Sequence, residues 1–347
     1  MGTSPVSGEV IGGTIRRNVN AKEQLILDID DLIDRDNSDN VVIEVTSSVP
    51  VYVQGYSQYV GSEFPLVSPA PIASMTMQGN IANIPRVQFG GGYQSEILLM
   101  NPGEEALTGQ IIVHGGRDGD LSDNYSIAPG GVYRWLSGAQ SGLARTGYVT
   151  IHSDGNTLPA GGARISLLDG EQLVTRSYVP TGQISRRVWI PVDNNPSTTR
   201  HGRISVNFHI VNNGAQVPAG ASVRLNLFSP NGSFVQRFEQ IIPIGEQWDI
   251  SLVELAKSDR FRGSVRIASD VPVSVSATQV TENINGDLIE MELPIVDENT
   301  ATIGRPLLLD GEGLASEIIL LNTDQSEVEG EFEFYSANGD STELILR

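Results

Sequence analysis

The sequence predicts an all-β protein made of tandem antiparallel β-sandwich (Ig-like) domains of about 110 residues, close to the usual length of such a domain. Three observations predict this fold. A nine-residue stretch recurs along the chain, one turn type recurs after it, and short alternating segments are separated by Gly, Pro, Asn and Asp. No part of the 347-residue chain has a long amphipathic helical period.

The repeated stretch is clearest at Tyr93–Asn101, YQSEILLMN, and at Leu314–Asn322, LASEIILLN. A weaker copy is Ile204–Asn212, ISVNFHIVN. The last residues of the copies are separated by 212 − 101 = 111 and 322 − 101 = 221 residues, which indicates a unit of about 111 residues and close to twice that length. We therefore expect this stretch to be the entry strand of the sandwich in every unit.

A recurring turn follows each copy of this stretch and the next expected strand. Asp-Gly and Asn-Gly are the strongest short hairpin signals, because both central positions of the turn need a positive φ. We therefore expect the same hairpin in each unit. The three dipeptides are Asp118-Gly119, Asn231-Gly232 and Asn338-Gly339.

A tryptophan-containing segment recurs after the hairpin. Tyr125–Trp135 matches Phe238–Trp248, which places Trp135 opposite Trp248 at an offset of 248 − 135 = 113, and the N-terminal copy has Leu25 there. An apolar residue at one position in three copies is typical of a core side chain. Beyond it, Leu252–Lys257 is long enough for only one or two helical turns.

The phase of the repeat predicts four segments. Residues 1–84 are the second half of a unit plus a connector, 85–190 and 191–304 are full sandwiches, and 305–347 are the first half of a further unit. A half sandwich leaves an unpaired edge and an open apolar face. Either the chain is part of a longer array, or the frame differs and the terminal halves pair within or between chains.

These repeats resemble a known type of module. The text GGGYQSEILLMNPGEEALTGQIIV, followed by DGD, IAPGGVYRW and GYVTIHSD, is similar to tandem β-sandwich modules of large secreted or surface proteins of environmental bacteria. The second unit departs from the pattern, with Val211–Gly214 where the first has Met100–Gly103. The resemblance implies an extracellular structural or adhesive role and transfers no catalytic residue.

Composition excludes several classes of protein. The 22 basic and 42 acidic residues give a net charge of −20, which repels nucleic acid and anionic lipid. The absence of cysteine excludes disulfides, Cys-based metal sites and a Cys nucleophile. No apolar run approaches the roughly 20 residues that span a bilayer, so we expect no membrane insertion. The N-terminus lacks a signal sequence, so the protein is either cytosolic or part of a longer chain.

The sequence does not favour an enzyme. Its histidines have no H-x-H or H-E-x-x-H spacing, and no G-x-S-x-G nucleophile motif occurs. Gly90–Gly92 is followed by an expected strand and lacks the Lys-Ser/Thr of a phosphate-binding loop. The four histidines are His114, His152, His201 and His209.

Two clusters are candidate binding sites. An acidic loop between Asp28 and Asp39 offers several carboxylates of the kind that Ca²⁺ prefers, although it lacks the EF-hand pattern, and a solvated acidic loop is the alternative. Three tyrosines after Val51 could line a glycan groove or pack on a strand face. The calcium candidates are Asp28, Asp30, Asp31, Asp34, Asp36 and Asp39, and the glycan candidates are Tyr52, Tyr56 and Tyr59.

We therefore expect a non-catalytic structural or adhesive spacer of a bacterial extracellular or surface protein. Its expected partners are other copies or repeats of the same protein and surface glycans. No cofactor other than Ca²⁺ is expected. The alternative function is a carbohydrate- or calcium-binding β-sandwich module. Specific hits in a glycan screen that are lost on substitution of Tyr52 and Tyr56 would favour this alternative.

Overall fold

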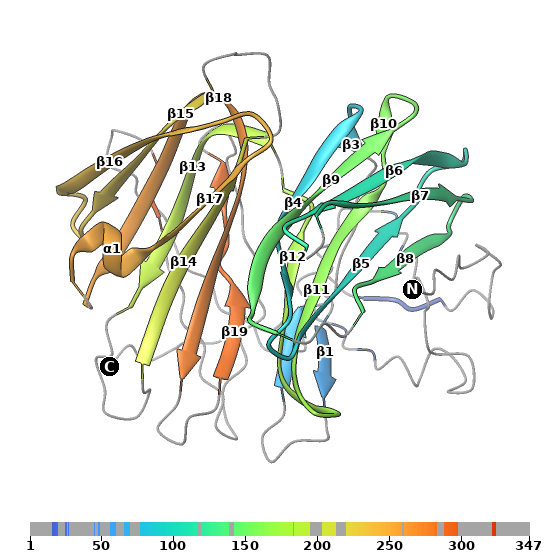
Figure 1. Cartoon of the computed structure of the whole chain (residues 1–347), viewed down its shortest axis with the longest axis horizontal. Helices are drawn as coiled ribbons and strands as arrows, with labels where there is room; N and C mark the ends of the chain where they lie inside the picture. The colour runs from blue at the N-terminus through green and yellow to red at the C-terminus, as the bar shows by residue number, and fades with distance from the viewer. Residues whose placement is uncertain are drawn as a thin grey trace.

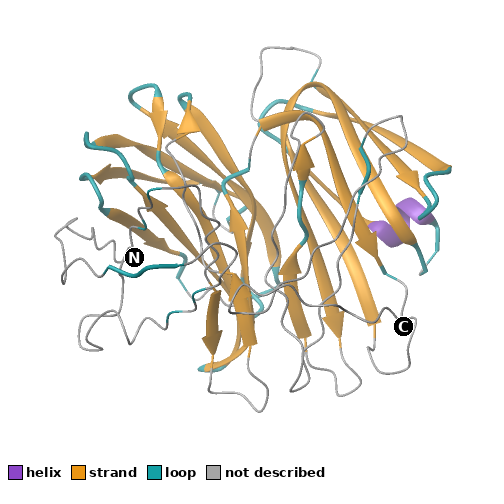
Figure 2. Cartoon of the chain, turned by 180° about the vertical axis from the view of Figure 1, so that it is seen from behind, coloured by secondary structure: helices purple, strands orange, loops and turns teal. Residues whose placement is uncertain are grey.

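A computed structural model of the chain describes most of residues 77–297 and a few short segments outside them. Within the described residues the protein is all-β, with antiparallel sheets and one short helix (Figures 1 and 2), as expected. None of the described helical residues forms a span that is long and apolar enough to cross a membrane. The described residues are 16–19, 25, 27, 45, 48, 56–59, 66–69, 77–116, 119–138, 142–182, 184–194, 203–212, 220–258, 260–282, 288–297 and 321–323.

The first region, residues 77–182, contains two four-stranded sheets, with the strand orders β12-β11-β5-β8 and β4-β9-β6-β7. Buried side chains from both sheets form one hydrophobic cluster, which includes Ile84, Leu99 and Ile151. The strands are β3 (Met77–Gln78), β4 (Ile81–Phe89), β5 (Tyr93–Met100), β6 (Leu107–His114), β7 (Leu121–Ile127), β8 (Val132–Leu136), β9 (Arg145–Ser153), β10 (Thr157–Leu158), β11 (Ala160–Asp169) and β12 (Gln172–Pro180).

The second region, residues 184–297, forms one eight-stranded sheet that curls around β18. The first half of β18 pairs with β13 and β15, and its second half pairs with β14 and β19. Two short strands, β1 (Tyr56–Tyr59) and β2 (Leu66–Pro69), form a separate hairpin. The elements of the second region are β13 (Ile184–Asp193), β14 (Arg203–Val211), β15 (Ala221–Phe228), β16 (Phe234–Ile242), β17 (Gln247–Ser251), α1 (Leu252–Ala256), β18 (Arg262–Glu282), β19 (Leu288–Glu292) and β20 (Val296–Asp297).

The two regions have the same strand connectivity. In the first region β9 pairs with β4 and β6, and β6 pairs with β7; in the second, the first half of β18 pairs with β13 and β15, and β15 pairs with β16. Likewise β5 lies between β8 and β11, as β14 lies between β17 and the second half of β18. The strands of the two four-stranded sheets therefore have counterparts in the sheet of the second region.

Asn101 and Asn212, the last residues of the repeated stretch, have the same role in both regions. Asn101 is buried, and its Nδ2 donates to the Ile127 carbonyl at 3.0 Å, while Asn212 Nδ2 donates to the Ile242 carbonyl at 2.9 Å. The backbone carbonyl of each asparagine accepts a hydrogen bond from the N–H of a turn glycine, Gly130 in the first region and Gly245 in the second. The side chain and the backbone of the asparagine therefore hold the turn between two strands against the end of a third strand.

This hydrogen-bond pattern corrects the expected pairing of the tryptophans. Gly130 and Gly245 are 115 residues apart (245 − 130), not 113, so the counterpart of Trp248 is Tyr133. The strand register agrees, because Tyr133 pairs with Leu99 and Trp248 pairs with Ile210, two residues before the asparagine in each case. Trp135 is buried in the first core, as expected, whereas Trp248 is only partly buried against the second.

The described strands confirm the hairpins at the first two copies, since β6 pairs with β7 and β15 pairs with β16 across connections that contain Gly119 and Gly232, with φ of +99° and +79°. The expected pair of positive-φ positions is not found at Asn231-Gly232, where only the glycine has a positive φ, because the connection from Phe228 to Phe234 is longer than a two-residue turn. The third copy, at Asn338-Gly339, lies outside the described residues. The expected boundary between residues 190 and 191 falls inside β13, which pairs with β18 and β20.

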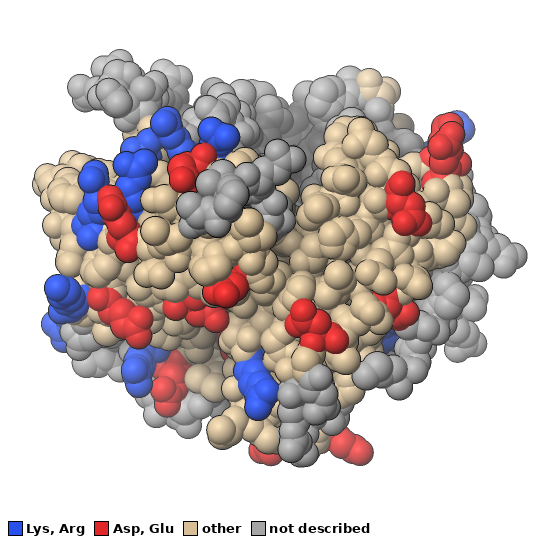
Figure 3. Space-filling model, turned by 45° about the horizontal axis from the view of Figure 1, so that its top comes forward, with Lys and Arg blue, Asp and Glu red and all other residues tan. Residues whose placement is uncertain are grey.

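Charged side chains are unevenly distributed over the surface. In Figure 3, Lys and Arg are seen mainly at the left, on the side where Figure 1 places β15 and β16. The right side of the same view, over the first region, carries mostly acidic side chains. A chain with a net charge of −20 therefore has a local concentration of cations on one side of the second region.

Candidate functional site

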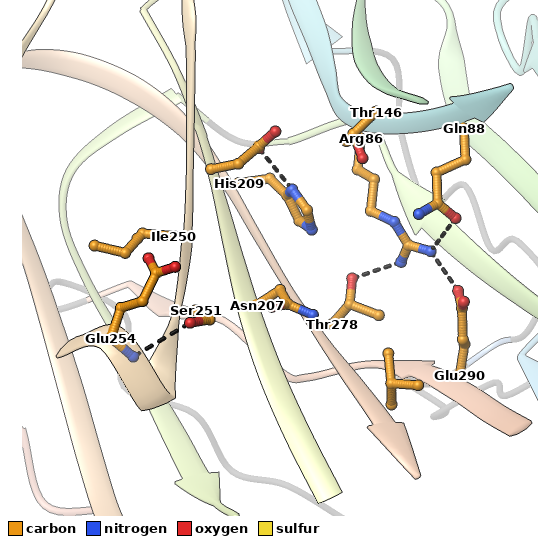
Figure 4. A pocket seen from close by; sticks show the side chains of 12 residues that line it. Arg86, Gln88, Thr146, Asn207, His209, Ile250, Ser251, Glu254, Thr278 and Glu290 are labelled. Carbon is orange, nitrogen blue, oxygen red and sulfur yellow. Dashed lines mark hydrogen bonds and ion pairs between the residues drawn. The ribbon is translucent and has the colours of Figure 1, made fainter. Parts of the chain in front are cut away.

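The two regions are joined by a buried polar cluster centred on Arg86 of β4 (Figure 4). The Arg86 side chain is 1% exposed and forms ion pairs with Glu290 and Glu292 of β19. Its Nη1 lies 2.7 Å from Glu292 Oε1 and also donates to Thr278 of β18, while Nη2 donates to Glu290 and, at 3.0 Å, to Gln88 Oε1. The guanidinium of the first region is thus held mainly by acceptors of the second. We call this contact the joint.

A local irregularity in β4 accompanies the placement of Arg86. The pairing of β4 with β9 shifts register between Ile84 and Val87, both of which are fully buried in the first core. Pro85 in this interval has no N–H to offer the ladder. Its carbonyl accepts instead from Gln247 Nε2 of the second region, at 3.1 Å. The break in the ladder therefore coincides with the point where the strand meets the second region.

The carboxylates of the joint are themselves held by further hydrogen bonds. Tyr93 of β5 donates its hydroxyl to Glu290 Oε1 at 2.7 Å, and the Glu290 amide donates to Thr175 Oγ1 of β12 at 3.0 Å. Thr278 donates to Glu292 Oε1 at 2.6 Å. Burial and the neighbouring Glu290 raise the pKa of the Tyr93 phenol, which therefore stays a neutral donor. Most polar atoms of the cluster thus have a partner, as a buried network requires.

One guanidinium faces two carboxylates in this network, so the cluster has an excess of negative charge when both are ionised. Burial raises the pKa of the Glu292 carboxyl, and the Arg86 charge and the Thr278 hydrogen bond oppose this rise. The direction follows from desolvation, which disfavours the charged form of a buried acid. Glu292 therefore gains a proton more easily in the folded state than in the unfolded chain.

A second contact joins the regions beside the cluster. The Tyr148 hydroxyl of β9 donates to the Gly245 carbonyl in the turn between β16 and β17. His114 of β6 stacks on the Tyr148 ring, with centroids 4.2 Å apart. Burial raises the pKa of Tyr148 to about 12, so its hydroxyl remains protonated at neutral pH. The turn that Asn212 fastens is thus also a contact of the joint.

A polar cavity of about 290 Å³ opens next to Arg86, between the two regions. His209 and Asp249 form one of its walls, with His209 Nδ1 2.8 Å from Asp249 Oδ1, and Glu254 lies at its α1 side. Four hydrogen bonds to protein acceptors already occupy the Nη atoms of Arg86. The arrangement therefore serves to hold the regions together, and it leaves little of the guanidinium for an anionic ligand.

The candidate binding residues from the sequence do not take part in this site. The six aspartates from Asp28 to Asp39 and Tyr52 lie outside the described residues. Tyr56 and Tyr59 lie in β1, where the structure does not describe their side chains. Within the described part of the chain, no three His, Asp or Glu side chains are grouped as metal ligands would be. The calcium and glycan sites stay predictions.

Only weak signals for the joint are present in the sequence. Arg86 is a charged residue in a mostly apolar segment, IANIPRVQF, and follows a proline. Glu290 and Glu292 alternate with apolar residues in β19. Alternating carboxylates are also typical of a solvated strand face, so their burial could not be inferred without the partner region. The decisive contacts join residues about 200 positions apart, as in the Arg86–Glu290 pair (290 − 86 = 204).

Comparisons with known proteins identify no relative. No protein-family model matches the chain, and no curated protein matches it.

Proposed function

We propose that this chain is a non-catalytic spacer segment of a bacterial extracellular or surface protein, built from tandem Ig-like β-sandwich units. Its function would be to hold and display units at a fixed spacing. Other repeats of the same protein are the proposed partners, with surface glycans as a further class.

The shared connectivity of the two regions supports a tandem array. Both regions place the repeated stretch, Tyr93–Asn101 or Ile204–Asn212, in the same strand with the same neighbours. The terminal asparagine of each stretch fastens the same turn. A common scaffold of this kind is expected if one unit has been duplicated. The contacts that the two regions share are strand pairings and turn contacts, and they are not contacts to a ligand.

The joint is the observation that carries a spacer function. Interfaces between domains of one chain are usually polar and allow relative motion. Here, Arg86 is almost completely buried between carboxylates of the other region. Separating the regions would expose this side chain to water but would also break its ion pairs and the contacts of Tyr93 and Tyr148. We therefore infer that the two regions keep one relative orientation.

The extracellular location rests on the resemblance of the repeats to modules of secreted and surface proteins. A fixed orientation between successive units suits a protein that must span distance outside the cell. The net charge of −20 is compatible with such a role and unfavourable for binding nucleic acid.

A distance measurement tests the spacer. Because the chain has no cysteine, S122C on β7 and K257C after α1 would each introduce a single site for a spin label on an exposed position. We expect one narrow distance distribution by pulsed electron paramagnetic resonance, and a broader one when R86M is added. A broad distribution in the otherwise unchanged protein would contradict a fixed orientation and would remove the basis of the proposal.

A further inference from the structure

The outward side of β13, β15, β16 and the first half of β18 forms a continuous surface, which we call the distal face. Alternate residues of these strands, such as Val188, Leu225 and Ile267, are buried in the second core, so their neighbours point away from it. The strand register aligns Trp189, Arg266, Asn226 and Arg237 in one row across the sheet, and Arg187, Ala268, Arg224 and Glu239 in the next.

The distal face is cationic in an acidic protein. Its two rows contain four arginines and one glutamate, a formal charge of 4 − 1 = +3, whereas the whole chain has −20. In Figure 3, basic side chains gather over the second region, with acidic side chains between them. The one glutamate, Glu239, is 3.9 Å from Arg237, and both side chains are more than half exposed. Such an exposed pair does little to neutralise the face.

Aromatic side chains lie at one end of the distal face. Trp189, Phe228 and Phe234 form a chain of ring contacts, with centroids 5.2 Å and 5.9 Å apart, and Phe234 remains 56% exposed. The Arg266 guanidinium lies 5.6 Å from the Trp189 ring centre. The Trp189 Nε1 donor is buried and has no hydrogen-bond partner. The exposed Phe234 ring at the end of this cluster indicates a surface that a partner would cover.

The counterpart of this surface in the first region is the side that forms the joint. Tyr148 of β9 corresponds to Ser264 of β18, and His114 of β6 corresponds to Phe228 of β15, because each pair is aligned across the equivalent strands. In the first region these positions contact the following region through Tyr148 and Gly245. The distal face is therefore the place where the second region would meet the unit that follows it.

The chain that follows begins at this face and has the complementary charge. β20 is the edge strand of the same sheet and pairs Val296 with Trp189 and Asp297 with Val188, so residues 298–347 are joined to the fold at this edge. Residues 298–347 contain 11 acidic and 2 basic residues, a formal charge of 2 − 11 = −9. They also contain the third copy of the repeated stretch, whose counterpart β14 lies at the joint.

We propose, on the basis of the tandem array inferred above, that the distal face is the docking surface for the acidic segment 298–347 of the same chain. Carboxylates of that segment would pair with Arg224 and Arg237, which are both exposed, and its apolar residues would cover Phe234. This second joint uses several exposed arginines and aromatic rings, where the first uses one buried arginine. Its stability therefore depends more on ionic strength than that of the first joint.

Zero-length cross-linking of the full chain tests the docking. Carbodiimide joins a lysine amine to a carboxylate only when they are in contact, and the chain has lysines only at positions 22 and 257. In R224K, which keeps the charge of the face, we expect cross-links to carboxylates within 298–347 that decrease several-fold at high salt. R164K is the matched control, because Arg164 pairs with Glu96 and should link to that residue instead.

Three results would overturn the proposal. The first is that R224K links only to its neighbour Glu239. The second is that links to 298–347 form between ¹⁵N-labelled and unlabelled chains, which would make a second copy the occupant. The third is that polygalacturonate binds the unmodified chain, is lost in R224E, and no link to 298–347 forms, which would make an acidic polysaccharide the occupant. If any of these results is found together with a narrow distribution of the distance between the two spin labels, the docking inference is overturned and the spacer proposal remains.

Discussion

Corresponding surfaces of the two regions show how one scaffold can form different contacts. On β5 and β11 of the first region, Glu96 pairs with Arg164 and with Arg134 of β8, all within one sheet. The equivalent positions of the second region hold Asn207, Thr278 and Asp249, since each set is aligned by the same strand pairs. There Asp249 pairs with His209 of β14, and Thr278 contacts Arg86 of the other region.

The comparison shows that the residues facing the core specify the fold of each unit, whereas the residues facing outward specify which contacts the unit makes. Glu96 is almost buried although its arginines are about one-third exposed. Arg86, by contrast, is buried together with Glu290. Replacing one side of a buried pair leaves an uncompensated charge, whereas a partly exposed pair is compensated by water. The two clusters should therefore respond very differently to the same kind of mutation.

The largest expected effect is on the joint. R86M leaves Glu290 and Glu292 without their cation, and we expect it to lower the free energy of unfolding by about 3–5 kcal/mol. The triple variant R86M/E290Q/E292Q removes the charges together and should recover most of this loss. R134A is the matched control and should cost about 1 kcal/mol or less, because Arg134 is partly exposed. Calorimetry measures all three, and equal losses in R86M and R134A would contradict a buried clamp.

An intermediate effect is expected at the asparagines that the two regions share. N101A and N212A each leave a strand-end carbonyl without its donor, which should cost about 1–3 kcal/mol. Trp135 reports on the first region and Trp189 with Trp248 on the second, so urea unfolding followed by fluorescence of single-region tryptophan variants separates the effects. N124A, on the exposed side of β7, is the control. If either N101A or N212A leaves the free energy of unfolding unchanged, the two turns are not equivalent.

The smallest effect concerns the pH dependence of the joint. The pKa of Glu292 is raised in the folded state, so its contribution to stability is greatest below the unfolded pKa of about 4.3 and is lost as pH rises through the folded value. E292Q should resemble the protonated form and remove this part of the pH dependence. Unfolding measured between mildly acidic and neutral pH should show a shallower slope in E292Q than in the unchanged chain. A parallel slope would assign the effect to other groups.

Local chemistry made several elements predictable. Asp118-Gly119 and Asn231-Gly232 specify hairpins because glycine tolerates the positive φ that the turn needs. The apolar run from Ile97 to Met100 indicates a strand, and Ile97 and Leu99 of this strand enter the core. The predicted pairing of the tryptophans was wrong by two residues. It matched Trp248 with Trp135 because both are tryptophan, whereas the hydrogen bonds of the turn glycines and the strand register align Trp248 with Tyr133.

The all-β class, the repeated strand and the first two hairpins could be predicted from the sequence, since they depend on residues that are neighbours along the chain. The contact of Arg86 with Glu290 and Glu292, and the single surface formed by the cationic rows of the distal face, became visible only in the folded chain. Burial of a charge depends on which distant strand supplies its partner, and a local pattern does not contain this information. A strand's own pattern of alternation says which side faces outward, but not what it meets there.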